Sequence, residues 1–372
     1  MNTRNDEHLY SLALSLIPKI GPSVYKNIIS YSGSAQKFFN LPVGKAAKIP
    51  RIGSKLLESL RQKNQYLSQA EKLIGQAEKL GVKILTYASP EFPKRLKAIE
   101  DSPAVLFVKG NIDLNSHRML GVVGTRNATD YGKSVTRKII EEIAPYKPVI
   151  VSGLAYGIDI EAHRAALHHD LPTVAVMGSP IDKIYPYQHK NTADQMLENG
   201  GLISEFRPGS DMVPGNFPQR NRIIAGLSDA LIVVEAAKKG GALITAEIAF
   251  SYNKEVFAVP GNLQSPYSEG CNYLIKYMKA NIYLGTKDLE ESLSWVKGEG
   301  TIAPQPQPFS LETVAEEHRP IIQAFLENPE QQIDQLSWST NIPISVLASS
   351  LLQLEFLGLI RSLPGKTYKL VK

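Results

Sequence analysis

The residues best suited to bind a ligand are arginines that stand among glycine and other small residues. Residues 124–126 read Gly-Thr-Arg, and residues 217–222 read Phe-Pro-Gln-Arg-Asn-Arg. A guanidinium group matches the geometry of phosphate oxygens, and glycine allows backbone N–H groups to approach an anion closely. Arg126, Arg220 and Arg222 together exceed what one small anion needs, so they favour a row of phosphates. The aromatic ring at the start of the second stretch offers a face on which a base can stack.

These residues follow short apolar runs that alternate with helical stretches between about residues 103 and 295. Continuous apolar runs of this kind are typical of parallel strands that helices cover on both faces. We predict strands at 105–108, 119–123, 149–151, 173–177, 202–204, 231–234 and 256–259. We predict helices at 132–144, 158–168, 189–199, 219–225 and 243–252. The predicted fold class is therefore α/β, with a Rossmann-like doubly wound sheet.

In such an open sheet, ligands bind beyond the carboxyl ends of the strands. Nearly every loop at those predicted ends is rich in Gly, Ser, Thr or Arg. Backbone N–H groups, hydroxyls and helix N-termini in loops of this kind hold phosphates. A mononucleotide pocket would satisfy the same general pattern. However, no G-x-G-x-x-G fingerprint follows the first strand of the domain, and the sequence contains no Walker A loop.

The first hundred residues are predicted to be helical, and they contain a short repeat. Residues 17–21 read Ile-Pro-Lys-Ile-Gly, residues 49–53 read Ile-Pro-Arg-Ile-Gly, and a helical run follows each. A glycine turn that opens a helix is the plan of a helix-hairpin-helix, which presents N–H groups to a phosphate. Gly21 and Gly53 can equally serve only the contact between helices, so both interpretations stay open. We assign residues 1–100 to a helix-hairpin-helix or SAM-like domain.

The C-terminal part of the chain has a different composition. The polar, proline-rich residues 298–310 are predicted to form a semi-rigid linker that ends the Rossmann-like domain of residues 101–297. Residues 311–372 are predicted to form a winged helix, from three short helices followed by a strand, a turn and a strand. No Lys or Arg lies between Arg319 and Arg361, and the module is net acidic. A protein-contact or regulatory role is therefore favoured over direct DNA binding.

The charges are unevenly distributed along the 372 residues, whose formal net charge is +5. Residues 1–100 carry 16 Lys and Arg against 7 Asp and Glu, whereas residues 101–307 carry 20 against 22. The basic excess favours a polyanionic partner, although a solvated basic surface is the simpler alternative. No apolar run is long enough to insert into a membrane, and the single cysteine, Cys271, excludes an intrachain disulfide. We expect a cytoplasmic protein.

The sequence offers no recognised catalytic pattern. It lacks a nucleophile elbow, an H-E-x-x-H sequence and a cluster with metal-ligand spacing. His168 and His169 are expected to cap the end of a helix rather than to bind a metal. Asp159 and Glu205 each follow a strand, where we expect them to orient loop amides or to pair with an arginine. Cys271 is expected to be inert, and we predict no enzyme activity, no cofactor and no metal.

The order and content of these loops resemble the DprA family, also called Smf, of bacterial DNA-processing proteins. The resemblance covers essentially the whole α/β domain, and the stretch at 217–222 is its most specific part. The N-terminal helices and the winged helix also match the commonest three-part layout of the family. The matching stretches are 124–126, 131–132, 152–159, 185–186, 204–205, 217–228, 243–246 and 259–261.

The resemblance implies a homodimer, formed through the Rossmann-like domain, that binds single-stranded DNA and loads the RecA recombinase onto it. It also implies which residues contact DNA, with the arginines on phosphates and the aromatic ring beside the strand. These are Gly124, Arg126, Ser152, Gly153, Lys190, Phe217, Arg220, Asn221, Arg222, Gly241 and Thr245.

Three departures from the family pattern concern individual loops. Residues 178–180 read Gly-Ser-Pro where the family has Gly-x-Gly, which weakens this loop as a phosphate cradle. Residues 240–241 read Gly-Gly where the family has Ser-Gly, so one hydroxyl is absent. Tyr187 replaces a common basic residue, for which Lys190 is the candidate substitute.

The alternative function is a nucleotide-processing enzyme, similar to an N-glycosidase, with Asp159 and Glu205 as its acids.

Overall fold

The computed structural model describes residues 3–297, 315–357, 359–363 and 367–370. It contains two compact units, residues 1–300 and residues 301–372. The predicted linker at 298–310 lies outside the described residues, as does the turn between the last two strands. None of the helices in the described ranges is both long enough and apolar enough to cross a bilayer.

The first unit is built on a nine-stranded sheet with the order β1-β2-β6-β5-β4-β3-β7-β8-β9. In this order, all neighbouring strands from β6 through β3 to β9 pair in parallel. At the other edge, β2 pairs antiparallel with both β6 and β1. This mostly parallel sheet confirms the predicted fold class. The strands are β1 Lys83–Thr86, β2 Val105–Gly110, β3 Met119–Val123, β4 Val149–Ser152, β5 Thr173–Met177, β6 Gly200–Ser204, β7 Ala230–Val233, β8 Glu255–Ala258 and β9 Asn281–Ile282.

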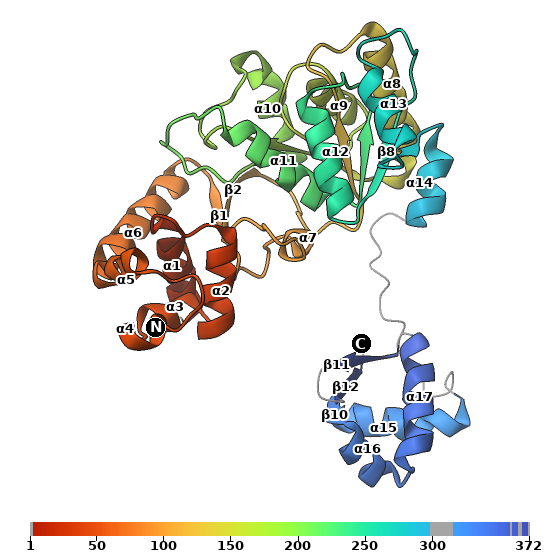
Figure 1. Ribbon diagram of the computed structural model, residues 1–372. Coiled ribbons are helices and arrows are strands. Elements are labelled where there is room, and N and C mark those ends of the chain that lie inside the picture. The colour runs from red at the N-terminus through yellow and green to blue at the C-terminus, as the bar shows by residue number, and fades with distance from the viewer. Residues whose placement is uncertain (1–2, 298–314, 358, 364–366, 371–372) are drawn as a thin grey trace. The chain divides into compact units, whose positions relative to one another are not determined.

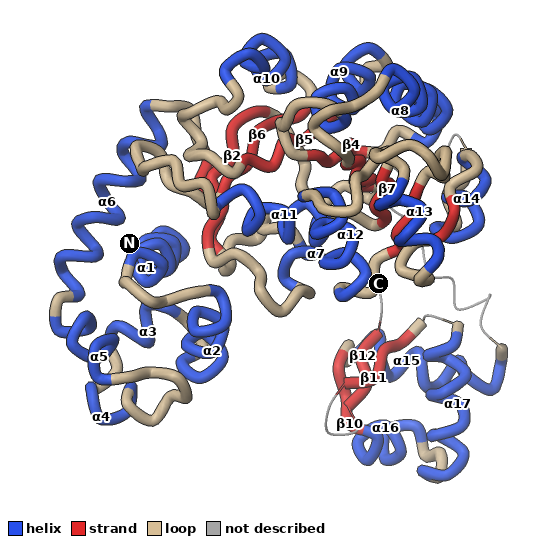
Figure 2. The backbone as a smooth tube through the Cα atoms, turned by 45° about the horizontal axis from the view of Figure 1, so that its top comes forward, coloured by secondary structure: helices blue, strands red, loops and turns tan. Residues whose placement is uncertain are grey.

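Helices cover both faces of the sheet, as the fully apolar strands require. Alternate residues of β3 enter different cores: Leu120 and Val122 face one core, whereas Met119 and Val123 face the other. Figure 2 shows α8, α9 and α10 along one side of the strands and α11, α12 and α13 along the other. These helices are α8 Asp130–Ile143, α9 Ile158–His168, α10 Lys190–Met196, α11 Asn216–Leu227, α12 Gly241–Ser251 and α13 Glu269–Lys276; the short α7, Lys94–Lys97, and α14, Thr286–Leu293, complete this part.

The N-terminal residues form a group of helices that adjoins the first two strands (Figure 1). Leu12, Tyr25 and Phe38 of these helices share one hydrophobic core with Val105 and Phe107 of the sheet. The expectation that all of residues 1–100 are helical is wrong at β1, whose four residues, Lys-Ile-Leu-Thr, show no alternation of apolar and polar side chains. The helices are α1 Thr3–Leu16, α2 Pro22–Ser32, α3 Ala35–Phe39, α4 Val43–Ala46, α5 Ser54–Arg61 and α6 Lys63–Lys79.

The predicted internal repeat is present as two similar turns. Lys19 has φ = 69° and Arg51 has φ = 67°, and each turn leads to an extended glycine, Gly21 or Gly53, that precedes a helix. A left-handed conformation is uncommon for a residue with a side chain. The repeat at the sequence level therefore corresponds to a repeat of backbone geometry, with a cation at the left-handed position of both copies.

The second unit is a winged helix, as predicted. A three-stranded antiparallel sheet with the order β10-β12-β11 packs with three helices around Ile321, Phe325, Leu336 and Leu351. Sequence analysis missed β10 because its residues, Glu-Gln-Gln, show no apolar pattern. The elements are α15 Arg319–Glu327, β10 Glu330–Gln332, α16 Ile333–Thr340, α17 Ile344–Phe356, β11 Ile360–Leu363 and β12 Thr367–Leu370.

Candidate nucleic-acid interface

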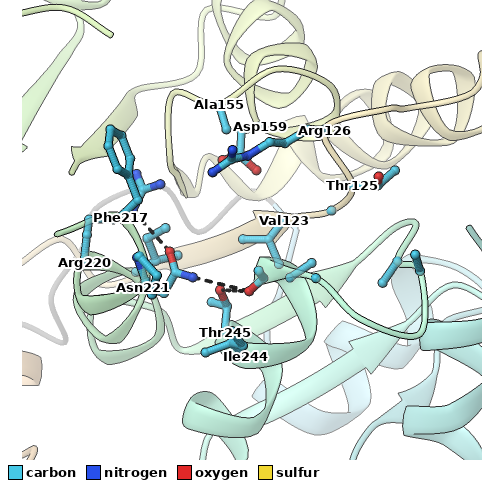
Figure 3. Close-up of a pocket in the computed structure, with 18 of the residues that line it drawn as sticks. Val123, Thr125, Arg126, Ala155, Asp159, Phe217, Arg220, Asn221, Ile244 and Thr245 are labelled. Carbon is cyan, nitrogen blue, oxygen red and sulfur yellow. Dashed lines mark hydrogen bonds between the residues drawn. The ribbon is translucent and has the colours of Figure 1, made fainter. Parts of the chain in front are cut away.

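The direction in which the chain adds strands reverses between β3 and β7. The strands β4, β5 and β6 follow on one side of β3, and β7, β8 and β9 follow on the other. The loops after β3 and β7 therefore diverge to opposite faces, and a crevice forms at the carboxyl ends of these strands. A cavity of about 500 Å³ lies here, and we call it the switch-point cavity (Figure 3). Its lining includes Gly124, Arg126, Phe217, Lys239 and Gly241.

Arg126 is the free cation of the loop after β3. Its side chain is exposed, and its guanidinium group makes no hydrogen bond or ion pair within the described residues. Figure 3 shows it extending toward the cavity above Asp159. An arginine held on a short loop with its donors open is suited to charge-assisted hydrogen bonds with phosphate.

Close backbone contacts hold this loop in place. The backbone N–H of Thr125 donates to the carbonyl oxygen of Glu235 at 2.7 Å, and that of Ile158 donates to the Thr125 carbonyl at 3.2 Å. Gly157 has φ = +80°, and a Cβ atom there would collide with the same carbonyl. The carboxylate of Glu235 accepts hydrogen bonds from the hydroxyl of Thr129 at 2.6 Å and from its backbone N–H at 3.0 Å. The loop that carries Arg126 is thus tied to β7 and to the start of α9.

The N-terminus of α12 forms the opposite wall of the switch-point cavity. This helix has eleven residues, and Gly240 precedes it without a side-chain cap. The first N–H groups of a helix have no partner inside the helix, and together with the helix dipole they attract anions. The hydroxyl of Thr245 donates to the Gly241 carbonyl at 2.9 Å, so this predicted contact residue faces its own helix. The amide of Asn221 donates to the same carbonyl at 3.3 Å.

Lys239 is a cation that sequence analysis missed. It lines the switch-point cavity directly before the start of α12, its side chain is exposed, and it has no ion pair within the part of the chain that the structure describes. The signal was available in the Lys-Lys-Gly-Gly sequence at 238–241, since a cation before an open helix N-terminus is suited to phosphate. Its neighbour Lys238 is also exposed but does not line the cavity.

Phe217 lies at the other end of the cavity, at the start of α11. Its ring is half-buried and tilts against that of Tyr185, with 5.4 Å between the ring centroids. The two rings border a smaller cavity of about 100 Å³, the aromatic cavity, which Arg126 and Tyr156 also line. Gly178 lies beneath Phe217, because a Cβ atom there would be 2.6 Å from the ring. The Gly-Ser-Pro loop therefore supports the aromatic ring.

The side chain of Arg220 is buried, and its contacts mainly stabilise the fold around the cavity. It is 6% exposed, and its guanidinium group donates to the carbonyl oxygen of Val176 and, at 3.2 Å, to the side-chain oxygen of Asn221. A Cβ atom at Gly153 would be 2.6 Å from both terminal nitrogens of Arg220 and would collide with Asp159, so this glycine makes room for both groups. Burial lowers the pKa of Arg220 to about 10, and the carboxylate of Asp159 opposes that shift. Arg220 therefore carries its charge at neutral pH, and it lines both the switch-point cavity and the aromatic cavity.

The structure does not bring Arg222 to the same place. The two arginines are two residues apart on α11 and consequently lie on different sides of the helix. Arg222 is 6% exposed and donates to both carboxylate oxygens of Glu205 at 2.7 Å. The expectation that Arg126, Arg220 and Arg222 together face one row of phosphates is therefore wrong for Arg222, which does not line the cavity. The expectation that Glu205 pairs with a neighbouring arginine is confirmed.

Three further predicted contact residues, Ser152, Gly153 and Lys190, do not line the switch-point cavity. The hydroxyl of Ser152 is fully buried and donates to the carbonyl oxygen of Val122 at 2.6 Å, so it joins two strands. Lys190 is exposed on α10 and pairs with Asp194 at 2.5 Å, which is the i,i+4 spacing of a surface pair. Ser152 was carried over from the family resemblance and Lys190 was the candidate substitute for the basic residue that Tyr187 replaces; neither side chain lines the cavity that contains Arg126.

Three titratable groups of the α/β part, Asp159, His163 and Cys271, are buried. Burial raises the pKa of Asp159, and the cation of Arg220 opposes that shift. Burial lowers the pKa of His163 to about 3 and raises the pKa of Cys271 to about 12, so both are neutral under ordinary conditions. Within the described ranges, no group of three or more His, Cys, Asp or Glu side chains could hold a metal ion.

Comparison with known proteins identifies the family. The family model described as DNA recombination-mediator protein A matches residues 83–294, which is more than half of the chain. The chain belongs to this family. A second model, the DprA winged helix domain, matches residues 305–366, so the family's C-terminal module is also present.

Relatives of the family resemble this chain over most of its length. A protein named Smf from Synechocystis is 32% identical over 98% of this chain and 99% of its own. The DNA processing protein DprA of Bacillus subtilis is 40% identical over 61% of this chain and 77% of its own. The crystal structure of DprA from Streptococcus pneumoniae superposes with a TM-score of 0.65 at 31% identity, covering 77% of this chain and 97% of that one.

A structure of DNA processing protein A from Helicobacter pylori describes the single-stranded DNA binding mode of that protein. It superposes with a TM-score of 0.52 at 29% identity, and covers 58% of this chain and 97% of that one.

The two kinds of arginine are expected to differ in their effect on stability. Arg220→Ala should lower the free energy of unfolding by about 3 kcal/mol, because it leaves the Asp159 carboxylate and the Val176 carbonyl buried without their partner. Arg126→Ala should change it by less than about 0.5 kcal/mol, since this side chain is exposed and unpaired. Urea unfolding followed by circular dichroism measures both. Equal stability of the two variants would contradict the structural role of Arg220.

Proposed function

We propose that this protein binds single-stranded DNA along the carboxyl edge of its sheet and acts as a non-enzymatic mediator of recombination. The observation that carries the proposal is the content of the switch-point cavity. Two cations without partners among the described residues, Arg126 and Lys239, flank the open N-terminus of α12, and Phe217 stands at the end of the same cavity.

This arrangement supports a single strand as the ligand. Phosphates would contact Arg126, Lys239 and the first N–H groups of α12, which are three sources of positive potential on facing walls. Unstacked bases would rest against Phe217 and Tyr185, because base–aromatic stacking needs an exposed base face. Bases paired within a duplex offer no such face. The relative from Helicobacter pylori, which binds single-stranded DNA, supports the same ligand for this chain.

The basic N-terminal helices would contribute by steering. Residues 1–100 carry 16 positive against 7 negative side chains, whereas residues 101–307 are nearly balanced. A charge excess beside a binding edge raises the rate of encounter with a polyanion. The binding energy itself would come from the few cations at the cavity. We place the protein in the cytoplasm, which the buried single cysteine and the family's DNA substrate support.

The enzyme alternative lacks a suitable pair of acids. Asp159 lines the switch-point cavity, but Glu205 lies away from it and accepts both of its hydrogen bonds from Arg222. Two acids that act on one glycosidic bond must flank it from a single site. The proposal therefore remains a binding function without a cofactor.

We further propose that the bound strand is handed to the RecA recombinase by a homodimer formed through the Rossmann-like part. An edge strand with an exposed apolar border supports this proposal. Within the described residues β9 has a strand partner on one side only, and Met278, Ile282 and Leu284 around it are 84%, 42% and 74% exposed. Exposed apolar groups that cluster at a sheet edge are typical of protein contacts.

The first prediction concerns the binding site. Arg126→Ala combined with Lys239→Ala should weaken binding of oligo-dT by tenfold or more and reduce the dependence of log K on log salt, by about 0.7 for each phosphate that the variant no longer binds. Fluorescence anisotropy at several salt concentrations measures both quantities. The matched control is Arg164→Ala with Lys238→Ala, which removes the same charges from exposed side chains that lie outside the cavity and have no ion pair within the described residues. Equal binding by the two double variants would overturn the site.

The second prediction concerns the dimer. Met278→Glu combined with Leu284→Glu should convert the dimer to a monomer, because two charges would be buried without partners at an apolar contact. Sedimentation velocity measures the change. Leu263→Glu is the control, since Leu263 is 86% exposed in the loop after β8. A variant at the β9 edge that stays dimeric would show that another surface dimerises.

The third prediction concerns the winged helix. Its α17 has no cation, and Val346, Leu352 and, on α16, Trp338 are 55%, 54% and 91% exposed. Such a surface suits a protein rather than phosphates. Removal of residues 301–372 should leave the oligo-dT affinity within twofold of wild type but slow RecA filament formation on the same DNA, followed by the ATPase activity of RecA. Loss of DNA affinity with unchanged RecA loading would contradict this division of roles.

A further inference from the structure

A third cavity lies at the same edge of the sheet, where the N-terminal helices meet the loop after β6. Its volume is about 480 Å³, and we call it the junction cavity. The turn between α1 and α2 forms one wall, and residues 205–207 form the other. Lys19 and Arg207 line it from these two sides, and Phe206, which directly precedes Arg207, lines the second wall.

The cations of the junction cavity are available to a ligand. Lys19 and Arg207 are both exposed, and neither side chain has a hydrogen bond or an ion pair within the described residues. Glu205 is the one carboxylate among the residues that line this cavity, and Arg222 compensates its charge at 2.7 Å. The cavity therefore presents uncompensated positive charge beside apolar surface from Leu16 and Val105.

The two walls are held in fixed positions. Asp182 accepts the backbone N–H of Gly209 at 3.2 and 3.1 Å, and Lys183 donates to the carbonyl oxygen of Ser210 at 2.9 Å, so the loop after β6 is tied to the loop after β5. On the other wall, Lys19 occupies a left-handed conformation that glycine adopts without steric cost. Arg51 shares this conformation in the second copy of the repeat, so the conformation belongs to the turn rather than to the cavity.

The chemistry of the junction cavity matches that of the switch-point cavity. Each has a half-buried phenylalanine, Phe206 or Phe217, and each has two cations without partners in the described residues. Each lies at the carboxyl ends of parallel strands, with the aromatic cavity between them at β4 and β5. From β7 to β6 there are four strand spacings, which amount to about 19 Å. One extended strand of nucleic acid can therefore reach both.

We propose that the junction cavity is a second contact for the single-stranded DNA bound at the switch-point cavity, with Lys19 and Arg207 on phosphates and Phe206 against a base. The inference rests on the proposed function for the identity of the ligand. It extends the DNA path across the sheet edge to the N-terminal helices, and it gives those helices a direct contact in addition to any steering by charge.

The test uses full-length protein and two lengths of oligo-dT, about 4 and about 16 nucleotides, the range of site sizes typical of single-strand binding domains. Lys19→Gly combined with Arg207→Ala should leave the affinity for the short oligomer unchanged. It should lower the affinity for the long one by about tenfold and its salt slope by about 1.4, the value for two phosphate contacts. The glycine removes the cation and relieves the left-handed backbone, so this variant should fold.

The internal repeat supplies a matched control. Arg51 has the same backbone conformation in the second turn and is exposed, but it does not line the junction cavity. Arg51→Gly combined with Lys72→Ala on α6 removes the same total charge, here entirely from the N-terminal part, and should leave both affinities within twofold of wild type. An equal loss in the two variants would show that diffuse charge is responsible, and would overturn the second contact. No loss in the junction variant would overturn it as well.

The two proposals fail in different ways. If the variant at Arg126 and Lys239 binds both oligomers as wild type does while the junction variant loses affinity for the long oligomer, the switch-point assignment is wrong and the junction contact stands. If the variant at Arg126 and Lys239 loses affinity at both lengths and the junction variant loses none, the proposed function stands and the junction contact is wrong.

Discussion

The arrangement of α11, β5 and α9 at the carboxyl edge of the sheet depends on one buried cation. Arg220 extends from α11 to the carbonyl oxygen of Val176 at the end of β5 and lies beside Asp159 at the start of α9. It thus joins α11, whose second residue is Phe217, to the end of β5 and to the start of α9. Gly153 must lack a side chain for this contact to exist. A buried charge is tolerated only with such partners, and the position of the aromatic rim follows from it.

A division among the cations follows from this constraint. Arg220 and Arg222 are buried and satisfy carbonyl and carboxylate groups, whereas Arg126 and Lys239 are exposed and have no partner among the described residues. The first pair fixes the loops, and the second pair is free to meet an anion. The near balance of charge in residues 101–307, 20 positive against 22 negative side chains, is consistent with this division. Positive potential is then concentrated at a few points of the edge.

The sequence was sufficient to predict the sheet, the winged helix and the edge that carries the site, because long apolar runs and glycine-rich loops determine them. It was not sufficient to predict the direction of individual side chains. Arg220 and Arg222 look equivalent in a linear motif, but a helix turns each residue by about 100° and separates them. Ser152 looks like a loop hydroxyl, but it ends β4 inside the sheet. Lys239 was missed because its role depends on where α12 begins.

The N-terminal helices illustrate why a boundary in composition need not be a boundary in structure. They carry the basic excess, yet their apolar residues enter the same core as β2, and β1 continues the sheet beneath them. A shared core fixes the turn of Lys19 against the loop after β6, and a flexible attachment would not. Two walls that are built on one shared core can preorganise a binding cavity, which reduces the entropic cost of ordering a ligand there. Because the N-terminal helices and the sheet share one core, the basic surface of the helices can form part of the proposed path of the DNA strand.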